Sequence, residues 1–168
     1  MKSRTWLTGV VLLATAAGLI GCAAPQPLVM HEAVGPAQAI TQPTARSGKL
    51  VVYSAWDRFD TLDAEHPKHT PYTVRSDQGS AVARVRNQTG SFGHEPSAVS
   101  LAPGRYWVEG RATNVGSIRV PVVVRRGQTT VVYLDATTAP AGLGQNEMSW
   151  VRQPSGRVVG WKDQGDGR

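Results

Sequence analysis

The sequence of 168 residues is poor in cysteine and contains no long apolar run. Cys22 is the only cysteine, so no disulfide can form within the chain and no cysteine cluster can hold a metal ion. The apolar stretch Trp6–Ile20 falls short of the roughly 20 residues that a transmembrane helix needs. Positive charges exceed negative ones by six, but both signs are mixed and nothing resembles a basic patch for nucleic acid.

Catalytic motifs are also missing. His31-Glu32 lacks a second histidine four residues after the first, so the chain has no metalloprotease motif. Ser91 and Ser155 lie near glycines, but neither stands in a Gly-x-Ser-x-Gly pattern. No glycine-rich phosphate loop is present. These absences predict a protein that is not an enzyme and that has no catalytic residue, metal site or cofactor.

The first residues have the pattern of an export signal. Met1–Arg4 is positively charged and precedes the apolar stretch Trp6–Ile20, which ends in Leu19-Ile20-Gly21-Cys22. This ending resembles the signal of bacterial lipoproteins, in which an aliphatic residue, a small or aliphatic residue and Gly or Ala precede Cys. The resemblance implies a signal peptide over residues 1–21, a thioether-linked diacylglycerol on Cys22 and cleavage before it. The alternative is an ordinary secretory signal with an incidental cysteine.

Ala23 follows the expected lipidation site. In lipoproteins of Gram-negative bacteria an Asp at this place usually retains the protein in the inner membrane, so Ala23 favours the outer membrane. The resemblance implies a location in the cell envelope, facing the periplasm, with membrane lipid as a partner through acylated Cys22. Two or more acyl chains, at about 0.8 kcal/mol per buried methylene, hold a protein firmly to a bilayer.

The remainder divides by composition. Residues 22–47 are rich in Ala, Pro and Gln without a hydrophobic period, which predicts a flexible tether. Over residues 48–136 short runs of Val, Tyr and Thr alternate with turn residues, which predicts an all-β antiparallel β-sandwich. A linker and a C-terminal β-hairpin are expected over residues 137–168. The expected strands are Leu50–Trp56, Tyr72–Arg75, Ser80–Asn87, Ala98–Leu101, Arg105–Ala112, Ile118–Val124 and Thr129–Leu134, with Met148–Gln153 and Arg157–Trp161 in the hairpin.

One strand carries a special residue. Alternate side chains from Ile118 to Val124 are apolar and should share a buried face. Pro121 falls on the other face and cannot donate a ladder hydrogen bond. We therefore expect this strand at a sheet edge, or bulged at Pro121.

Three segments carry a second resemblance: V-S-L-A-P-G-R-Y-W-V-E-G at 99–110, the strand at 118–124, and R-G-Q-T-T-V-V-Y-L at 126–134. They look like the carboxypeptidase regulatory-like domains, which are transthyretin-like sandwiches with an L-x-P-G-x-Y-x-V strand, a return strand and a closing G-x-x-T-x-V-x-L strand. The similarity spans about residues 49–136, and the family's early G-x-V-x-D-x-x-G segment is missing. It implies an Ig-like or transthyretin-like topology and a non-catalytic module.

The loop from Asp57 to His69 is rich in groups that can bind metal ions. It contains Asp57, Asp60, Asp63, Glu65, His66 and His69, and His94 lies in another loop. Carboxylates could collect calcium, and two histidines with a carboxylate could hold zinc. The spacing does not match an EF-hand loop, however, and Lys68 places a cation between the two histidines. We interpret the segment as a solvated charged loop.

The C-terminal hairpin brings aromatic side chains together. A two-residue turn centred on Pro154-Ser155 would set Trp150 opposite Val159 and Met148 opposite Trp161, with all four side chains on one side. Trp150 and Trp161 could then form a platform for a sugar ring or a partner. Alternatively, the hairpin closes the end of the sandwich core.

Two functions of different classes fit these observations. The leading hypothesis is a lipid-anchored, non-catalytic envelope module that binds a protein, peptide or glycan partner. The alternative is a periplasmic hydrolase or metal-dependent enzyme that uses the Asp57–His69 loop.

Overall fold

The computed structural model describes residues 25–37, 46–57, 68–87, 95–138, 140 and 147–163. In this part of the chain every element is a strand except η1, a short 3-10 helix at Glu147–Ser149, and no helix is long and apolar enough to cross a membrane. The strands are β1 (Leu28–Val29), β2 (Val34–Gly35), β3 (Gly48–Tyr53), β4 (Trp56–Asp57), β5 (Lys68–His69), β6 (Tyr72–Ser76), β7 (Ala81–Val85), β8 (Val99–Leu101), β9 (Gly104–Ala112), β10 (Gly116–Val124), β11 (Thr129–Tyr133), β12 (Trp150–Arg152) and β13 (Val158–Lys162).

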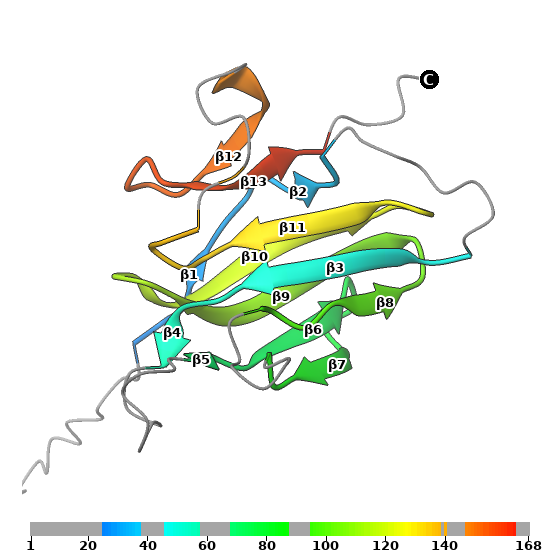
Figure 1. Cartoon of the computed structure of the whole chain (residues 1–168), viewed down its shortest axis with the longest axis horizontal. Helices are drawn as coiled ribbons and strands as arrows, with labels where there is room; N and C mark the ends of the chain where they lie inside the picture. The colour runs from blue at the N-terminus through cyan, green and yellow to red at the C-terminus, as the bar shows by residue number, and fades with distance from the viewer. Residues whose placement is uncertain are drawn as a thin grey trace, which may run out of the picture.

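The strands form two layers, with β4 and β5 as a small separate pair (Figure 1). The larger sheet has the order β12-β13-β2-β10-β9-β6-β7, and β1 also pairs with β10. The smaller sheet has the order β11-β3-β8. The predicted all-β sandwich is confirmed. Each expected strand is present, and the one expected over Leu50–Trp56 is divided into β3 and β4.

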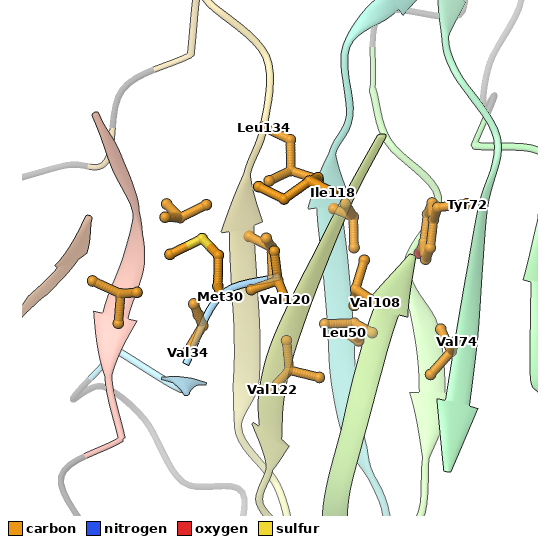
Figure 2. Close-up of a cluster of buried hydrophobic side chains, with 14 of the residues drawn as sticks. Met30, Val34, Leu50, Tyr72, Val74, Val108, Ile118, Val120, Val122 and Leu134 are labelled. Atoms are coloured by element: carbon orange, nitrogen blue, oxygen red, sulfur yellow. The ribbon is translucent and has the colours of Figure 1, made fainter. Parts of the chain in front are cut away.

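The core lies between the two sheets (Figure 2). On β10 the inward side chains from Ile118 to Val124 are each at most 1% exposed, as their alternation predicts. Leu50 and Val52 of β3 and Val132 of β11 are fully buried in the same cluster. Since burying one such side chain contributes roughly 1.5–3 kcal/mol, this apolar layer is the main source of stability.

Most of the described strand pairs are antiparallel, as predicted, but three pairs are parallel. β3 and β11 run parallel from the pair Lys49–Thr129 to the pair Tyr53–Tyr133. β1 and β2 both run parallel to β10. Side chains alternate with the same period in parallel and antiparallel strands, so the alternation that identified the strands carries no information about their relative direction.

The prediction of a flexible tether over residues 22–47 is wrong for residues 25–37. β1 and β2 pair with β10, and β2 also pairs with β13. Met30 and Val34 are buried in the core, Val34 completely (Figure 2). Each strand has only two residues, which is too short to show a period in the sequence. The N-terminal segment is nevertheless part of the larger sheet.

Pro121 lies in a central strand, and the β9–β10 ladder has no register shift, so the prediction of an edge or a bulge is wrong. The N–H of Met30 donates to the carbonyl of Arg119, so Arg119 turns its backbone polar groups toward the N-terminal segment. Pro121 comes two residues later and faces the same way. Because β1 ends at Val29 and β2 begins at Val34, the missing N–H of Pro121 falls where the neighbouring chain is interrupted.

On the outer face of the larger sheet, Glu109 of β9 pairs with one arginine from each neighbouring strand. Its carboxylate lies 2.6 Å from Nε of Arg75 and 2.7 Å from Nη2 of Arg119, which also stands over the Trp107 ring. Burial by itself raises the pKa of Glu109. The hydrogen bond and charge of Arg75, with the charge of Arg119, outweigh that effect, and the net pKa is lowered.

Val34→Ala should lower the free energy of unfolding by about 2 kcal/mol, because it removes buried methyl groups and leaves a cavity. Val29→Ala is the matched control in the same segment; Val29 is 41% exposed, and its truncation should cost less than about 0.5 kcal/mol. Urea unfolding followed by circular dichroism measures both changes. Equal losses would contradict the placement of this segment in the core.

Glu109→Gln should remove part of the pH dependence of stability. The folded-state pKa of Glu109 lies below that of the unfolded chain, so its ion pairs stabilise the fold above about pH 4.3 and are lost as the pH falls through the folded-state pKa. At pH 7 the loss should be on the order of 1 kcal/mol, since the carboxylate is part-exposed. Melting temperatures from pH 3 to pH 7 (roughly the range over which a carboxyl titrates) test this. The two proteins should converge at the acidic end, and parallel curves would refute the assignment.

Candidate functional site

The expected lipidation site, Cys22, lies outside the described residues, but the chain limits its distance from the fold. Leu28, where β1 begins, is the sixth residue after Cys22, and six residues reach at most about 20 Å. Leu28 pairs with Ile118, so β1 begins at the end of the sandwich where β10 begins. We call this end, with the β9–β10 turn at 113–115 and the last residues of β3 and β11, the proximal end; it is at the left in Figure 1.

Of the Asp57–His69 loop, the structure describes only its ends, Asp57, Lys68 and His69; Asp60, Asp63, Glu65 and His66, like His94 elsewhere, lie outside the described residues. The interpretation as a solvated loop is wrong for His69, which is 1% exposed. Its ring stacks on Trp56 with 3.9 Å between centroids. Among the described residues no group of three His, Cys, Asp or Glu side chains is placed to hold a metal ion.

His69 belongs to a buried polar cluster with Ser54, Thr70 and Asn87. Its Nδ1 lies 2.6 Å from the carbonyl oxygen of Ser54, and because a carbonyl only accepts, this nitrogen carries a proton. The Ser54 hydroxyl donates to the carbonyl of Thr70 at 2.6 Å and accepts from Nδ2 of Asn87 at 2.7 Å. The hydroxyl therefore has no base beside it and no solvent access, so Ser54 is not placed as a nucleophile.

The predicted register of the C-terminal hairpin is wrong. The structure pairs Trp150 with Trp161, not with Val159, and Met148 is 85% exposed in η1. Two features each shift the register by one residue. The turn includes Gly156 at φ 83°, and the ladder is irregular between Val151 and Arg152.

The hairpin is packed against the sandwich. Trp150 is 2% exposed, and its ring centroid lies 3.9 Å from that of the partly exposed Trp161. Val151 and Val159 belong to the core cluster. Gly160 passes so close to both sheets that a Cβ there would lie 2.5 Å from Val34 and 2.9 Å from the Val131 carbonyl oxygen. This packing favours the hairpin as a core cap over a platform formed by Trp150 and Trp161.

A cleft of about 540 Å³ opens at the proximal end between three turns. Its walls come from the β9–β10 turn, from residues 136–138 after β11, and from the β12–β13 turn. The lining combines apolar surface with hydroxyl, amide and guanidinium groups, including those of Arg152, Gln153 and Arg157, and no described lining residue is acidic. The arrangement can donate hydrogen bonds and attract negative charge. It offers neither a nucleophile beside a base nor a pair of carboxylates.

Hydrogen bonds fix one wall of the cleft. Asp135 is 1% exposed, and its Oδ2 accepts from the hydroxyl of Thr137 at 2.9 Å and from the backbone and hydroxyl of Thr138 at 3.1 and 2.7 Å. Nε1 of Trp56 donates to the same Thr137 hydroxyl at 3.1 Å. This wall is therefore preorganised by a buried carboxylate.

The sequence reasoning missed this cleft. Its three walls lie apart along the chain, at residues 113–115, 136–138 and 152–158, and no motif links them. The only local signal was that Arg152 and Arg157 flank the turn at Pro154–Gly156.

Trp150→Ala should destabilise the protein by about 3–5 kcal/mol, because it opens a large cavity at a buried site. Met148→Ala, two residues away at an exposed site, should change stability by less than about 0.5 kcal/mol. Thermal melts of both variants provide the comparison. If Trp150→Ala melts like the wild-type protein, the hairpin does not cap the core, and the hypothesis of a binding platform is favoured.

Comparison of the chain with models of protein families, with curated proteins and with solved structures finds no match, so the two resemblances rest on this chain's own residues.

Proposed function

We propose that the protein is a lipid-anchored, non-catalytic module of the bacterial cell envelope. It is attached to the outer membrane through Cys22 and faces the periplasm. The proposal is carried by one observation, the nearness of the lipoprotein-like run Leu19–Cys22 to β1. Only five residues lie between Cys22 and Leu28, and from there the chain is paired with β10. A lipid on Cys22 therefore holds the sandwich itself close to the bilayer.

The nearness distinguishes this protein from a domain on a long tether. A flexible coil of 26 residues over 22–47 would allow the domain to sample every orientation. With β1 built into the sheet, the first described residues lie within about 20 Å of the anchor, whereas β9 and β10, at nine residues each, extend about 30 Å. The proximal end is therefore the part of the sandwich held nearest to the headgroups.

The alternative function is a metal-dependent enzyme that uses the Asp57–His69 loop. One specific observation, at His69, supports it. The Nδ1 proton of His69 is directed at a carbonyl, and among the described residues its buried Nε2 has no partner. A metal-binding histidine commonly uses one nitrogen in this way and ligates with the other. Metal analysis of the purified protein separates the functions: stoichiometric zinc that is lost in His69→Gln would favour the enzyme.

Cys22→Ser should abolish lipidation and leave an uncleaved or mislocalised precursor in the cell. The reason is that the thioether lipid is the signal for cleavage before residue 22 in proteins with this pattern. Mass spectrometry of the wild-type protein should show an acylated N-terminal Cys22. The variant should carry no acyl chain and should retain residues 1–21 or be found away from the membrane. An unmodified Cys22 in the mature wild-type protein would overturn the proposed anchoring.

A further inference from the structure

We propose that the cleft at the proximal end binds the phosphate of an anionic phospholipid headgroup in the leaflet that carries the anchor. The chemistry of the cleft supports the phosphate, and the proposed anchoring at Cys22 supports the choice of a lipid as its source. The inference thus deepens the proposed function, since it assigns a membrane-facing orientation to the sandwich.

The first step concerns the two arginines of the cleft. Nη1 of Arg152 donates to the carbonyl of Gly156 at 2.9 Å, and Nη2 of Arg157 donates to the carbonyl of Ala136 at 3.0 Å. Neither arginine has a carboxylate partner among the described residues, in contrast to Arg75, Arg119 and Arg125. One nitrogen of each guanidinium group donates to a backbone carbonyl, which fixes the position of the group. The positive charge of each group is not paired with a carboxylate of the described residues. Guanidinium groups in this state suit phosphate oxygens.

The second step concerns Gln153, which lies between the two arginines in the turn. The residue is 3% exposed, and its Nε2 is buried with no hydrogen-bond partner in the described part of the chain. Its Oε1 accepts from the hydroxyl of Ser155 at 3.4 Å. Gln153 lines the cleft, and a buried amide nitrogen without an acceptor is an unusual feature of a folded protein. A ligand oxygen that reached this nitrogen through a small movement of the turn would satisfy it.

The third step is the location. The cleft uses the β9–β10 turn and the segment after β11, which are both at the proximal end. A second, smaller hollow on the same turn adds Arg111. Six residues of chain after Cys22 keep this end within reach of the lipid headgroups. At that distance each arginine is attracted to an anionic membrane surface.

The experiment uses Cys22 as a chemical handle, since it is the only cysteine in the chain. Residues 22–168, which contain every described strand, are coupled through the Cys22 thiol to a maleimide lipid in vesicles. Vesicles of phosphatidylcholine alone are compared with vesicles that also contain phosphatidylglycerol. Hydrogen exchange is read at the backbone of residues 153–157 and 113–115, and NMR follows the Gln153 side-chain amide.

We expect phosphatidylglycerol to slow exchange at these two turns, on the order of tenfold for two arginines near the surface, and to shift the Gln153 amide signal. Arg157→Glu and Arg152→Glu should each remove the effect. Arg126→Glu makes the same charge change in the exposed turn after β10, at the opposite end, and should leave it intact. Melting curves of the variants confirm that each is folded, and the milder Arg157→Gln replaces any variant that is not.

Several results would overturn the proposal. If Arg126→Glu removes the protection as fully as Arg157→Glu, the attraction is diffuse and not centred on the cleft. If inorganic phosphate shifts the Gln153 amide but phosphatidylglycerol gives no protection, the cleft takes a soluble phosphate and not the membrane. Because the coupling is chemical, these outcomes do not depend on lipidation in the cell, and an unmodified Cys22 in cells would refute only the proposed anchoring.

Discussion

Strand β10 has to be paired along both of its edges, and much of the rest of the structure follows from that requirement. Its inward side chains from Ile118 to Val124 are at the centre of the core, so the strand cannot lie at an open edge without exposing backbone polar groups beside the most apolar part of the molecule. β9 pairs with one edge along its full length. The N-terminal segment covers the other edge in two short pieces, and the interruption between them accommodates Pro121.

The same segment connects the fold to the proposed anchor. β2 is also the strand on which β13 pairs, so the C-terminal hairpin depends on the N-terminal segment for its place in the sheet. Val34 contacts Gly160 so closely that the two elements fix each other. The two ends of the described chain are thus joined in one layer, so the segment that leads to the proposed anchor also holds the hairpin, whose turn forms one wall of the cleft.

The sequence predicted those parts of the fold in which local chemistry decides the outcome. Runs of valine, tyrosine and threonine identified β9, β10 and β11, and alternation identified the buried face of β10, because burial on one side leaves a period of two. The sequence-based prediction was wrong where the structure depends on which strands pair with each other. Two-residue strands such as β2 have no period, parallel pairing of β3 with β11 leaves no local trace, and the hairpin register depended on one left-handed residue, Gly156, and one irregularity. For the same reason the cleft, built from three distant turns, could not be predicted.

The energetics assign different roles to the anchor and to the cleft. In the proposed arrangement, acyl chains on Cys22 contribute about 0.8 kcal/mol per buried methylene and supply nearly all of the membrane affinity. Two arginines at about 1 kcal/mol each could not hold the domain on a bilayer by themselves. Once the chain is anchored, however, a linker of a few residues gives the cleft an effective headgroup concentration in the millimolar range or above, at which such a weak contact is occupied for a substantial part of the time. The short connection between Cys22 and β1 therefore matters as much as the arginines, because the same cleft on a long flexible tether would meet headgroups too rarely to orient the sandwich.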